Sequence, residues 1–145
     1  MEYGIHDNAT RSEVFHKVVN HLLDQNESSQ NGTICVYRSP EGLACAIGCL
    51  IDDTTAKHWD DHYRGETGIR SIYSRLQRSI DPIPKWLNDK NLNLLTDLQN
   101  LHDIEDTYTK CVPIFMKMAQ KYRIKLLPEL RARLEQIQAA AKVTG

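Results

Sequence analysis

The residues of this chain most able to do chemistry are its cysteines, three of which, Cys35, Cys45 and Cys49, lie close together in the sequence. A thiol can serve as a nucleophile, as a metal ligand or as a small apolar core residue. If a helix begins near Ala44, Cys45 lies in its first turn, where free backbone N–H groups and the helix dipole stabilise a thiolate. Cys45 is therefore the candidate nucleophile.

A cysteine nucleophile needs a general base within hydrogen-bonding reach. His102 is the best candidate, because it follows Leu94 and Leu98 at helical spacing and so faces the core. Asp53 could orient its imidazole. The predicted catalytic residues of a cysteine-dependent hydrolase or transferase are thus Cys45, His102 and Asp53. In the alternative interpretation, His102 is a core histidine and the thiols are buried and reduced.

Cysteine and histidine also ligate zinc, so a structural zinc domain is a third interpretation. The Cys-x-x-Cys spacing of a zinc knuckle does not occur in the sequence. His58 and His62 stand four residues apart, as in a zincin helix, but that motif requires Glu where this chain has Trp59. No metal and no cofactor is therefore expected.

Two further features suggest ligand binding. Arg38 stands beside the turn of residues 39–42, where its guanidinium could grip a carboxylate or phosphate, or instead pair with Asp52 or Asp53. Residues 58–68 are polar and contain two glycines, which is typical of a mobile loop, either a lid over a ligand or plain surface. The residues predicted to bind a ligand are Arg38, His58, His62, Arg64 and His102.

These residues must be positioned by helices, because apolar side chains recur at helical spacing. Thr10 and Glu13 form a capping box before the first such stripe. Residues 34–37 favour a strand and residues 39–42 a tight turn. Residues 43–51 favour a short extended entry and then a buried helix starting near Ala44, with a brief hairpin as the alternative.

Later stripes predict helices within residues 69–80, 94–102 and 108–122, and Pro128 opens a last helix. Pro113 lies either in the first turn of its helix or at a kink. The expected fold class is mostly α, a compact single-domain helical fold with at most a short β-hairpin near residues 34–46.

Length and composition fit one soluble domain, with 145 residues, 41% hydrophobic and 26% charged. We expect residues 1–9 to be a flexible N-terminus and 128–145 a C-terminal helix, either an extension or an oligomerisation element. No stretch approaches the about 18 consecutive apolar residues that span a bilayer, so no membrane partner is expected. The first residues lack the pattern of a secretory signal, which predicts a cytoplasmic protein with reduced thiols.

The net charge of −1 is unevenly distributed. Residues 110–145 hold eight Lys and Arg against two Glu, whereas the preceding part holds ten basic and seventeen acidic residues. Few aromatic residues interleave with the basic ones, so nucleic acid is not the expected partner. The thin apolar seam of the last helix could dock on the domain or pair with a second copy, and a homo-oligomer is expected.

A pattern across the chain resembles small uncharacterised proteins carried by tailed phages and prophages. It consists of Cys35-x-Tyr37-Arg38, Gly42, Cys45-Ala46-Ile47-Gly48-Cys49-Leu50-Ile51-x-Asp53 and Leu98-Gln99-x-x-His102-Asp103. The resemblance runs from about Val14 to Pro128. This chain has Asp52 where relatives usually have Pro, and the helix around Arg131 extends beyond the usual end of the family.

The resemblance implies a phage or prophage origin and action in the cytoplasm of a bacterial host, but no reaction. By analogy with small accessory phage proteins, we expect a non-enzymatic binding protein that captures a host protein or a small anionic, nucleotide-like ligand, as in counter-defence. The cysteine-dependent enzyme and the structural zinc domain are the alternatives.

Overall fold

Apolar residues at helical spacing become helices over most of the chain. The computed structural model describes residues 3–26, 30–31, 34–63, 68–103 and 108–144. In chain order its elements are α1 Arg11–Gln25, β1 Gln30–Asn31, β2 Ile34–Cys35, the 3-10 helix η1 Gly48–Leu50, α2 Asp53–His62, α3 Ile69–Gln77, α4 Leu92–Gln99, the 3-10 helices η2 Asn100–Asp103 and η3 Tyr108–Cys111, α5 Val112–Lys121 and α6 Pro128–Thr144. The predicted mostly helical fold is confirmed, and the two short strands pair antiparallel.

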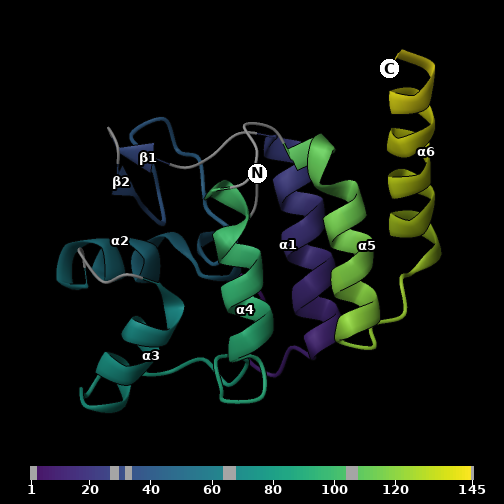
Figure 1. Ribbon diagram of the computed structural model, residues 1–145. Coiled ribbons are helices and arrows are strands. Elements are labelled where there is room, and N and C mark those ends of the chain that lie inside the picture. The colour runs from purple at the N-terminus through teal and green to yellow at the C-terminus, as the bar shows by residue number, and fades with distance from the viewer. Residues whose placement is uncertain (1–2, 27–29, 32–33, 64–67, 104–107, 145) are drawn as a thin grey trace.

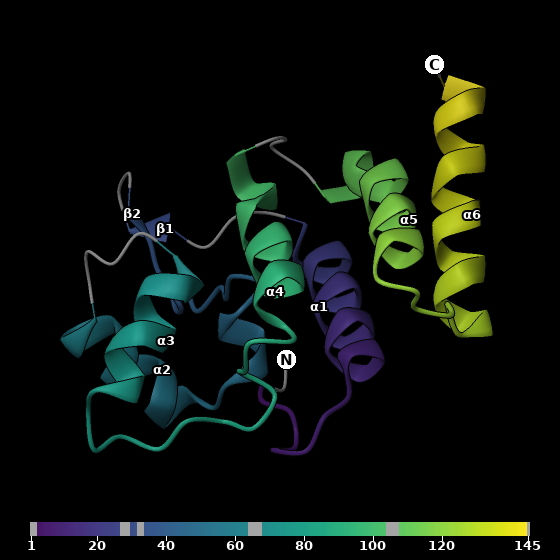
Figure 2. The same cartoon turned by 60° about the horizontal axis from the view of Figure 1, so that its bottom comes forward.

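Helix α1 lies at the centre of the molecule (Figure 1). It is flanked by α4 on one side and α5 on the other, and α6 lies beyond α5 (Figures 1 and 2). Helices α2 and α3 lie on the far side of α4, near the β-hairpin. The two ends of the molecule are therefore formed by the α2–α3 pair and by α6.

The predicted capping box defines the start of α1. The backbone N–H of Glu13 donates to the Thr10 side chain, and the Glu13 carboxylate accepts from the backbone N–H of Thr10. At the other end Asn26 adopts a left-handed conformation, which asparagine tolerates well. Its side-chain oxygen accepts the backbone N–H groups of Tyr108 and Thr109, so the end of α1 fixes the start of η3.

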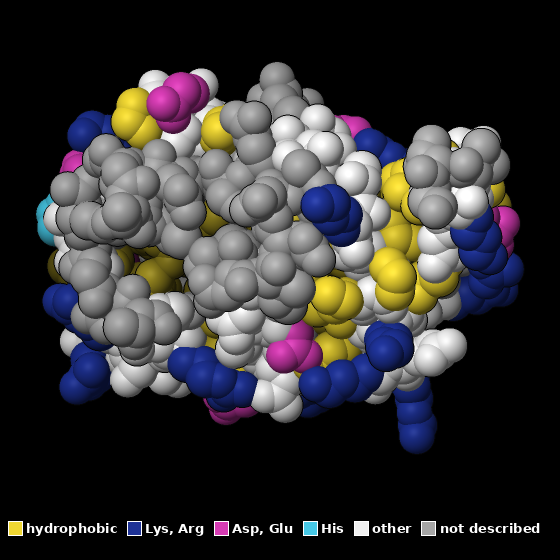
Figure 3. Space-filling model, turned by 45° about the horizontal axis from the view of Figure 1, so that its top comes forward, with side chains coloured by type: hydrophobic (Ala, Val, Ile, Leu, Met, Phe, Trp, Pro, Cys, Tyr) yellow, Lys and Arg dark blue, Asp and Glu magenta, His cyan; other side chains and the backbone are white. Residues whose placement is uncertain are grey.

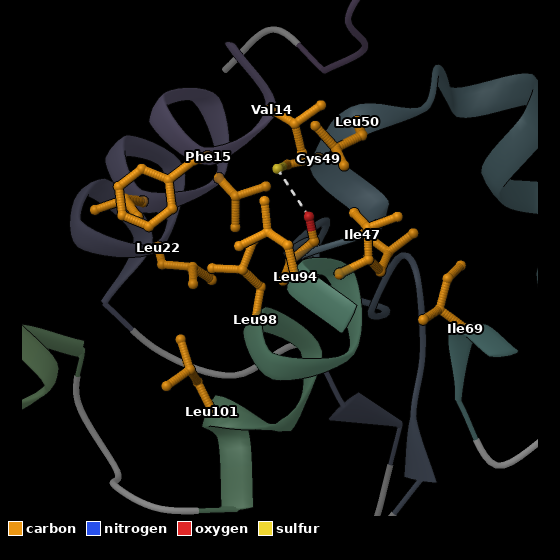
Figure 4. Packing of buried hydrophobic residues seen from close by; sticks show 14 of the residues in the cluster. Val14, Phe15, Leu22, Ile47, Cys49, Leu50, Ile69, Leu94, Leu98 and Leu101 are labelled. Atoms are coloured by element: carbon orange, nitrogen blue, oxygen red, sulfur yellow. Dashed lines mark hydrogen bonds between the residues drawn. The ribbon is translucent and has the colours of Figure 1, made fainter. Parts of the chain in front are cut away.

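The core is formed where α1 meets η1 and α4. Figure 4 shows Val14, Phe15 and Leu22 from α1 packed against side chains of η1 and of α4. Each of these α1 side chains is 1% exposed or less. The core partners that carry the labels in Figure 4 are Ile47, Cys49, Leu50, Ile69, Leu94, Leu98 and Leu101.

The favoured helix starting near Ala44 does not form. Ala44 instead pairs with Arg38 in an isolated antiparallel bridge, close to the hairpin alternative, and the helical turn that follows is the 3-10 helix η1. The physical reason lies in the partners of Ala44: its backbone N–H and C=O bond to the Gln25 amide, and His21 donates to the same carbonyl. An α-helix would need that carbonyl for the N–H of Gly48.

Of the predicted polar loop, residues 64–67 lie outside the described residues, and its first part is helical. Residues 58–62 belong to α2, whose N-cap is Asp52, with the Asp52 carboxylate accepting the N–H of Thr55 at 2.7 Å. The loop interpretation was wrong for these residues because α2 buries few side chains, among them Ala56 and Trp59, and its other faces are polar. Arg64 and Gly65 lie outside the described residues.

Helix α6 begins at Pro128 as predicted, and Pro113 lies in the first turn of α5. The linker between α5 and α6 is held by His16 of α1. The Nδ1 of His16 donates to the Ser12 carbonyl at 2.7 Å, and the Nε2 of His16 accepts the N–H of Leu127, in the linker, at 3.0 Å. Helix α6 thus follows a linker that is anchored to α1.

Candidate functional site

Arg38, a predicted ligand-binding residue, is engaged with the protein itself. Its Nη1 donates to the carbonyls of Tyr37 at 3.0 Å and Gly48 at 2.6 Å, and its Nη2 donates to the carbonyl of Ile51 at 2.8 Å. Its Nε donates to Asp53 at 2.9 Å, and the Tyr3 ring lies 4.1 Å from the guanidinium carbon. This corresponds to the alternative in which Arg38 fixes the turn to the following helix.

The N-terminal segment, expected to be flexible, lies along η1. The backbone N–H of Gly4 donates to the Cys49 carbonyl at 2.9 Å, and that of Ile5 to the Leu50 carbonyl at 3.2 Å. The hydroxyl of Tyr3 donates to the Gly42 carbonyl at 2.9 Å. The backbone around Arg38 is thus covered by the beginning of the chain.

The candidate nucleophile Cys45 lies in a setting that disfavours a thiolate. Burial raises the pKa of its thiol, although its sulfur accepts the N–H of Gly48 at 3.2 Å. Burial raises the pKa of Cys49 as well, and the Cys49 thiol donates to the Ala46 carbonyl at 3.1 Å, as the dashed line in Figure 4 shows. Cys45 is partly buried and Cys49 fully buried. A nucleophilic cysteine needs a lowered pKa, so both shifts favour the interpretation of reduced thiols packed in the protein.

Of the other two members of the predicted catalytic set, the structure describes the side chain of Asp53 alone. Asp53 binds Arg38, and its side chain is 85% exposed. The side chain of His102 lies outside the described residues, as do Arg64 and the side chain of Cys35. The proposed pairing of Cys45 with His102 therefore stays a prediction.

His58 and His62, also predicted to bind a ligand, lie one turn apart on α2 with their ring centroids 4.2 Å apart. His62 donates from Nδ1 to the backbone carbonyl of His58 at 3.0 Å. His58 donates from Nε2 to Oδ2 of Asp81 at 2.9 Å, because a carboxylate can only accept. The Tyr63 hydroxyl donates to the same Asp81 oxygen. Asp81 thus holds the C-terminal end of α2 to the segment that follows α3.

These contacts form one wall of a polar surface pocket of about 500 Å³. The opposite side is supplied by the end of α3, where Arg75 and Arg78 lie one turn apart. The residues that line the pocket are His62, Tyr63, Arg75, Arg78, Ser79 and Asp81. The volume is in the range that small-molecule ligands occupy.

The electrostatics of the pocket follow from its hydrogen bonds. The bonds from Tyr63 and His58 lower the pKa of Asp81, so this carboxyl is ionised at neutral pH. The same bond to Asp81 raises the pKa of Tyr63, whose hydroxyl therefore stays protonated. The guanidinium of Arg75 lies 5.2 Å from the Tyr63 ring centroid, a cation–π distance. The described residues thus contribute two permanent positive charges and one negative charge to the border of the pocket.

A second, smaller cavity of about 290 Å³ lies between α4, η2 and α5. Its floor contains Leu101, Ile114 and Met118, and Lys117 and Lys121 stand at its edge. Lys121 binds Asp97 at 3.0 Å, so one of these charges is already paired. The polar pocket at α2 and α3 is therefore the stronger candidate site.

Within the described residues, no three His, Cys, Asp or Glu side chains are grouped so that they could hold a metal ion. None of the helices in this part of the chain is both long and apolar enough to cross a membrane. We compared the chain with models of protein families, with curated proteins and with solved structures, and none of them matches it.

Sequence reasoning found one half of the pocket and missed the other. His62 was predicted, but Arg75, Arg78 and Asp81 were not. Their signal was the spacing of two arginines one turn apart just before the helix-breaking segment that starts at Asp81. That spacing shows a shared helix face, but not that α2 lies opposite it.

Proposed function

We propose that this protein is a phage-type accessory binding protein that captures a small anionic ligand in the pocket between α2 and α3. The phage origin and the host cytoplasm rest on the residue pattern from Cys35 to Asp103 described above. The ligand class rests on the observation that two arginines and a histidine converge on one pocket of ligand size.

Arg78 is the residue expected to contribute most to anion binding. Its Nε donates weakly to the Ser74 carbonyl at 3.4 Å, and its terminal nitrogens make no hydrogen bond to another described residue. A guanidinium with unused donors binds phosphate or carboxylate through paired hydrogen bonds. Arg75 adds a second positive charge one turn away.

The negative charge of Asp81 does not cancel this preference. Its Oδ2 already accepts hydrogen bonds from His58 and Tyr63, which stabilise the carboxylate. Among the described residues that line the pocket, Arg75 and Arg78 outnumber the one carboxylate.

The test measures the binding of a panel of small anions, including inorganic phosphate, citrate and nucleoside monophosphates. Calorimetry gives the affinity, and thermal unfolding gives the stabilisation of the protein by each anion. Arg78→Ala should weaken the binding of an anion that stabilises the protein by about tenfold or more, because a charge-assisted hydrogen-bond pair is lost. Since Arg78 is exposed, the variant should fold normally.

Arg131→Ala is the matched control, because it removes the same charge from the exposed surface of α6, away from the pocket. Equal losses in both variants would show a general charge effect and contradict the pocket assignment. No binding across the panel would contradict the proposed function and would favour capture of a host protein instead.

A further inference from the structure

An ionised carboxylate in a pocket for anions needs an explanation, because it repels the group that the arginines attract. Asp81 lines the pocket together with Arg75 and Arg78, and its side chain is 27% exposed. A ligand that carried negative charge alone would gain nothing from it. A ligand that also carried hydrogen-bond donors would.

The two oxygens of Asp81 differ in a way that fits this second kind of ligand. Oδ2 accepts both the Tyr63 hydroxyl and the His58 imidazole. Oδ1 accepts no hydrogen bond from the described residues. A carboxylate oxygen can accept two hydrogen bonds, so Oδ1 is the acceptor that remains for a ligand.

Hydrogen bonds of the backbone also fix the position of Asp81. Its backbone N–H donates to the Ser79 hydroxyl at 3.1 Å, and that hydroxyl donates to the Leu76 carbonyl at 2.9 Å. Together with the bonds at Oδ2, these contacts hold the carboxylate without any ligand. A fixed acceptor loses little entropy on binding, which makes its hydrogen bond more effective.

We propose that the ligand is a phosphorylated polyol, such as a sugar phosphate, whose phosphate contacts Arg78 and Arg75 and whose hydroxyl donates to Oδ1 of Asp81. This inference rests on the anion-binding function proposed above and adds the class of ligand. The shared chemistry is a phosphate monoester a few bonds away from a hydroxyl, which occurs in free sugar phosphates and in nucleotides.

His62 completes the arrangement. Because its Nδ1 donates to the His58 carbonyl, Nε2 is the nitrogen left for a ligand. In the neutral ring this nitrogen accepts a hydrogen bond from a hydroxyl group. Both groups of a phosphorylated polyol therefore have partners in the pocket.

The test compares phosphate monoesters that differ in their hydroxyls, measured by calorimetry with the full chain: methyl phosphate, ribose 5-phosphate and adenosine monophosphate, with ribose alone as the uncharged control. We expect ribose 5-phosphate to bind about tenfold more tightly than methyl phosphate, because a hydrogen bond to a charged group adds that much. Ribose alone should not bind measurably.

Asp81→Asn is the decisive variant, since it keeps the size of the side chain but removes its charge. The amide oxygen takes over the two hydrogen bonds at the position of Oδ2, which leaves a donating NH2 group in place of Oδ1. The variant should therefore bind ribose 5-phosphate and methyl phosphate about equally, with methyl phosphate bound as well as before or better. Asp89→Asn is the control, because it removes the same charge at an exposed aspartate that does not line the pocket, and it should retain the preference.

Each outcome separates this inference from the proposed function. Equal binding of methyl phosphate and ribose 5-phosphate to the wild-type protein would overturn the inference and leave an anion-binding protein. An unchanged preference in Asp81→Asn would also overturn it. Absence of binding for every anion would contradict both. Tighter binding of adenosine monophosphate than of ribose 5-phosphate would support the inference and identify nucleotides as the source.

Discussion

Arg38 shows how one charged side chain can organise several turns of backbone. Its guanidinium donates to the carbonyls of Tyr37, Gly48 and Ile51, which come from the residue before Arg38, from the start of η1 and from its C-cap. From α2, the Asp60 carboxylate accepts the backbone N–H groups of Tyr37 and Arg38. The side chain of Arg38 is only 15% exposed, so these bonds form largely out of water, where they are most effective.

Replacing Arg38 with Met should lower the free energy of unfolding by about 2–4 kcal/mol, because it leaves several carbonyls without a donor. Asp53→Asn is the control. It weakens the ion pair of Arg38 but touches an 85% exposed side chain, and it should cost no more than about 0.5 kcal/mol. Urea denaturation measures both values. A similar loss in both variants would mean that the ion pair, and not the carbonyls, carries the effect.

Cys45 should react slowly with iodoacetamide in the folded protein, because burial raises its pKa and leaves little thiolate at neutral pH. Its rate should rise at least about tenfold when the chain is unfolded in urea, as the thiol returns to its ordinary pKa. Peptide mass spectrometry resolves the rate at each cysteine. Fast alkylation of Cys45 at pH 7 in the native protein would instead support the cysteine-dependent enzyme.

For single residues, the sequence predicted which kinds of contact a side chain could make better than it predicted the function of that side chain. The choice between a ligand and Asp53 as the partner of Arg38 was open, because both satisfy a guanidinium equally well. The setting of Cys45 follows from the bonds of the Gln25 amide to the backbone of Ala44, nineteen residues later in the chain. Such a bond leaves no local signal.

At the scale of elements, the helices with strong local signals were predicted, and the part of α2 from His58 onward was not. Helix α1 has a capping box and a continuous apolar stripe, and its start matches the prediction. Helix α2 has an aspartate N-cap but buries few residues, so its last turns resembled a loop. Gly48 gave no indication of its role, which is to let η1 approach the Tyr37 carbonyl: a Cβ there would lie 2.5 Å from that oxygen.

Helix α6 is attached through few contacts, which makes its docking easy to test. Leu130 and Leu134 are 2% and 0% exposed, and Arg133 binds Asp24 of α1 at 2.7 Å. At the α6 end of the molecule, Lys and Arg side chains lie beside hydrophobic surface (Figure 3). The docked face of α6 is therefore narrow and the rest faces outward.

Leu134→Ala should destabilise the protein by about 2–5 kcal/mol if α6 unfolds together with the core, because it removes a fully buried side chain. Leu127→Ala, at a side chain that is 57% exposed, should change the stability by no more than about 0.5 kcal/mol. Circular dichroism during urea unfolding measures both. A small helical loss in Leu134→Ala that precedes the main transition would show that α6 unfolds separately.

For the whole molecule, we expect the stability to depend on pH through His21 at pH values above those at which carboxyl groups titrate. This side chain is 5% exposed and donates to the Ala44 carbonyl at 2.8 Å, and burial lowers its pKa from the ordinary value of 6.5. In the unfolded chain His21 takes up a proton as the pH falls below 6.5, whereas in the folded protein it resists protonation. The unfolded state is thus favoured at lower pH.

The contribution of His21 to the free energy of unfolding should therefore be constant above pH 6.5. Below pH 6.5 it should fall by at most about 1.4 kcal/mol per pH unit, the limit for one proton. His21→Gln retains a donor for Ala44 but cannot titrate, so its stability should fall less between pH 6.5 and 5. Urea denaturation at several pH values gives the two slopes. Equal slopes in both proteins would contradict the assignment to His21.

The assembly of the pocket could not be predicted from the sequence at this scale. It is built by His62 from one helix, Arg75 and Arg78 from the next, and Asp81 from the segment that follows. Each is an ordinary surface residue on its own element. What makes them a site is the bond from Asp81 back to His58 and Tyr63, which folds the chain on itself across about twenty residues.

The central position of α1 has a consequence for how the protein is made. This helix is synthesised first, yet its neighbours come from residues 47–50, from α4, from Tyr108 and from the linker at Leu127. While a ribosome is still translating the chain, the apolar stripe of α1 has no complete cover until most of the protein has emerged. Part of this stripe should therefore stay exposed to solvent until the linker after α5 has been synthesised.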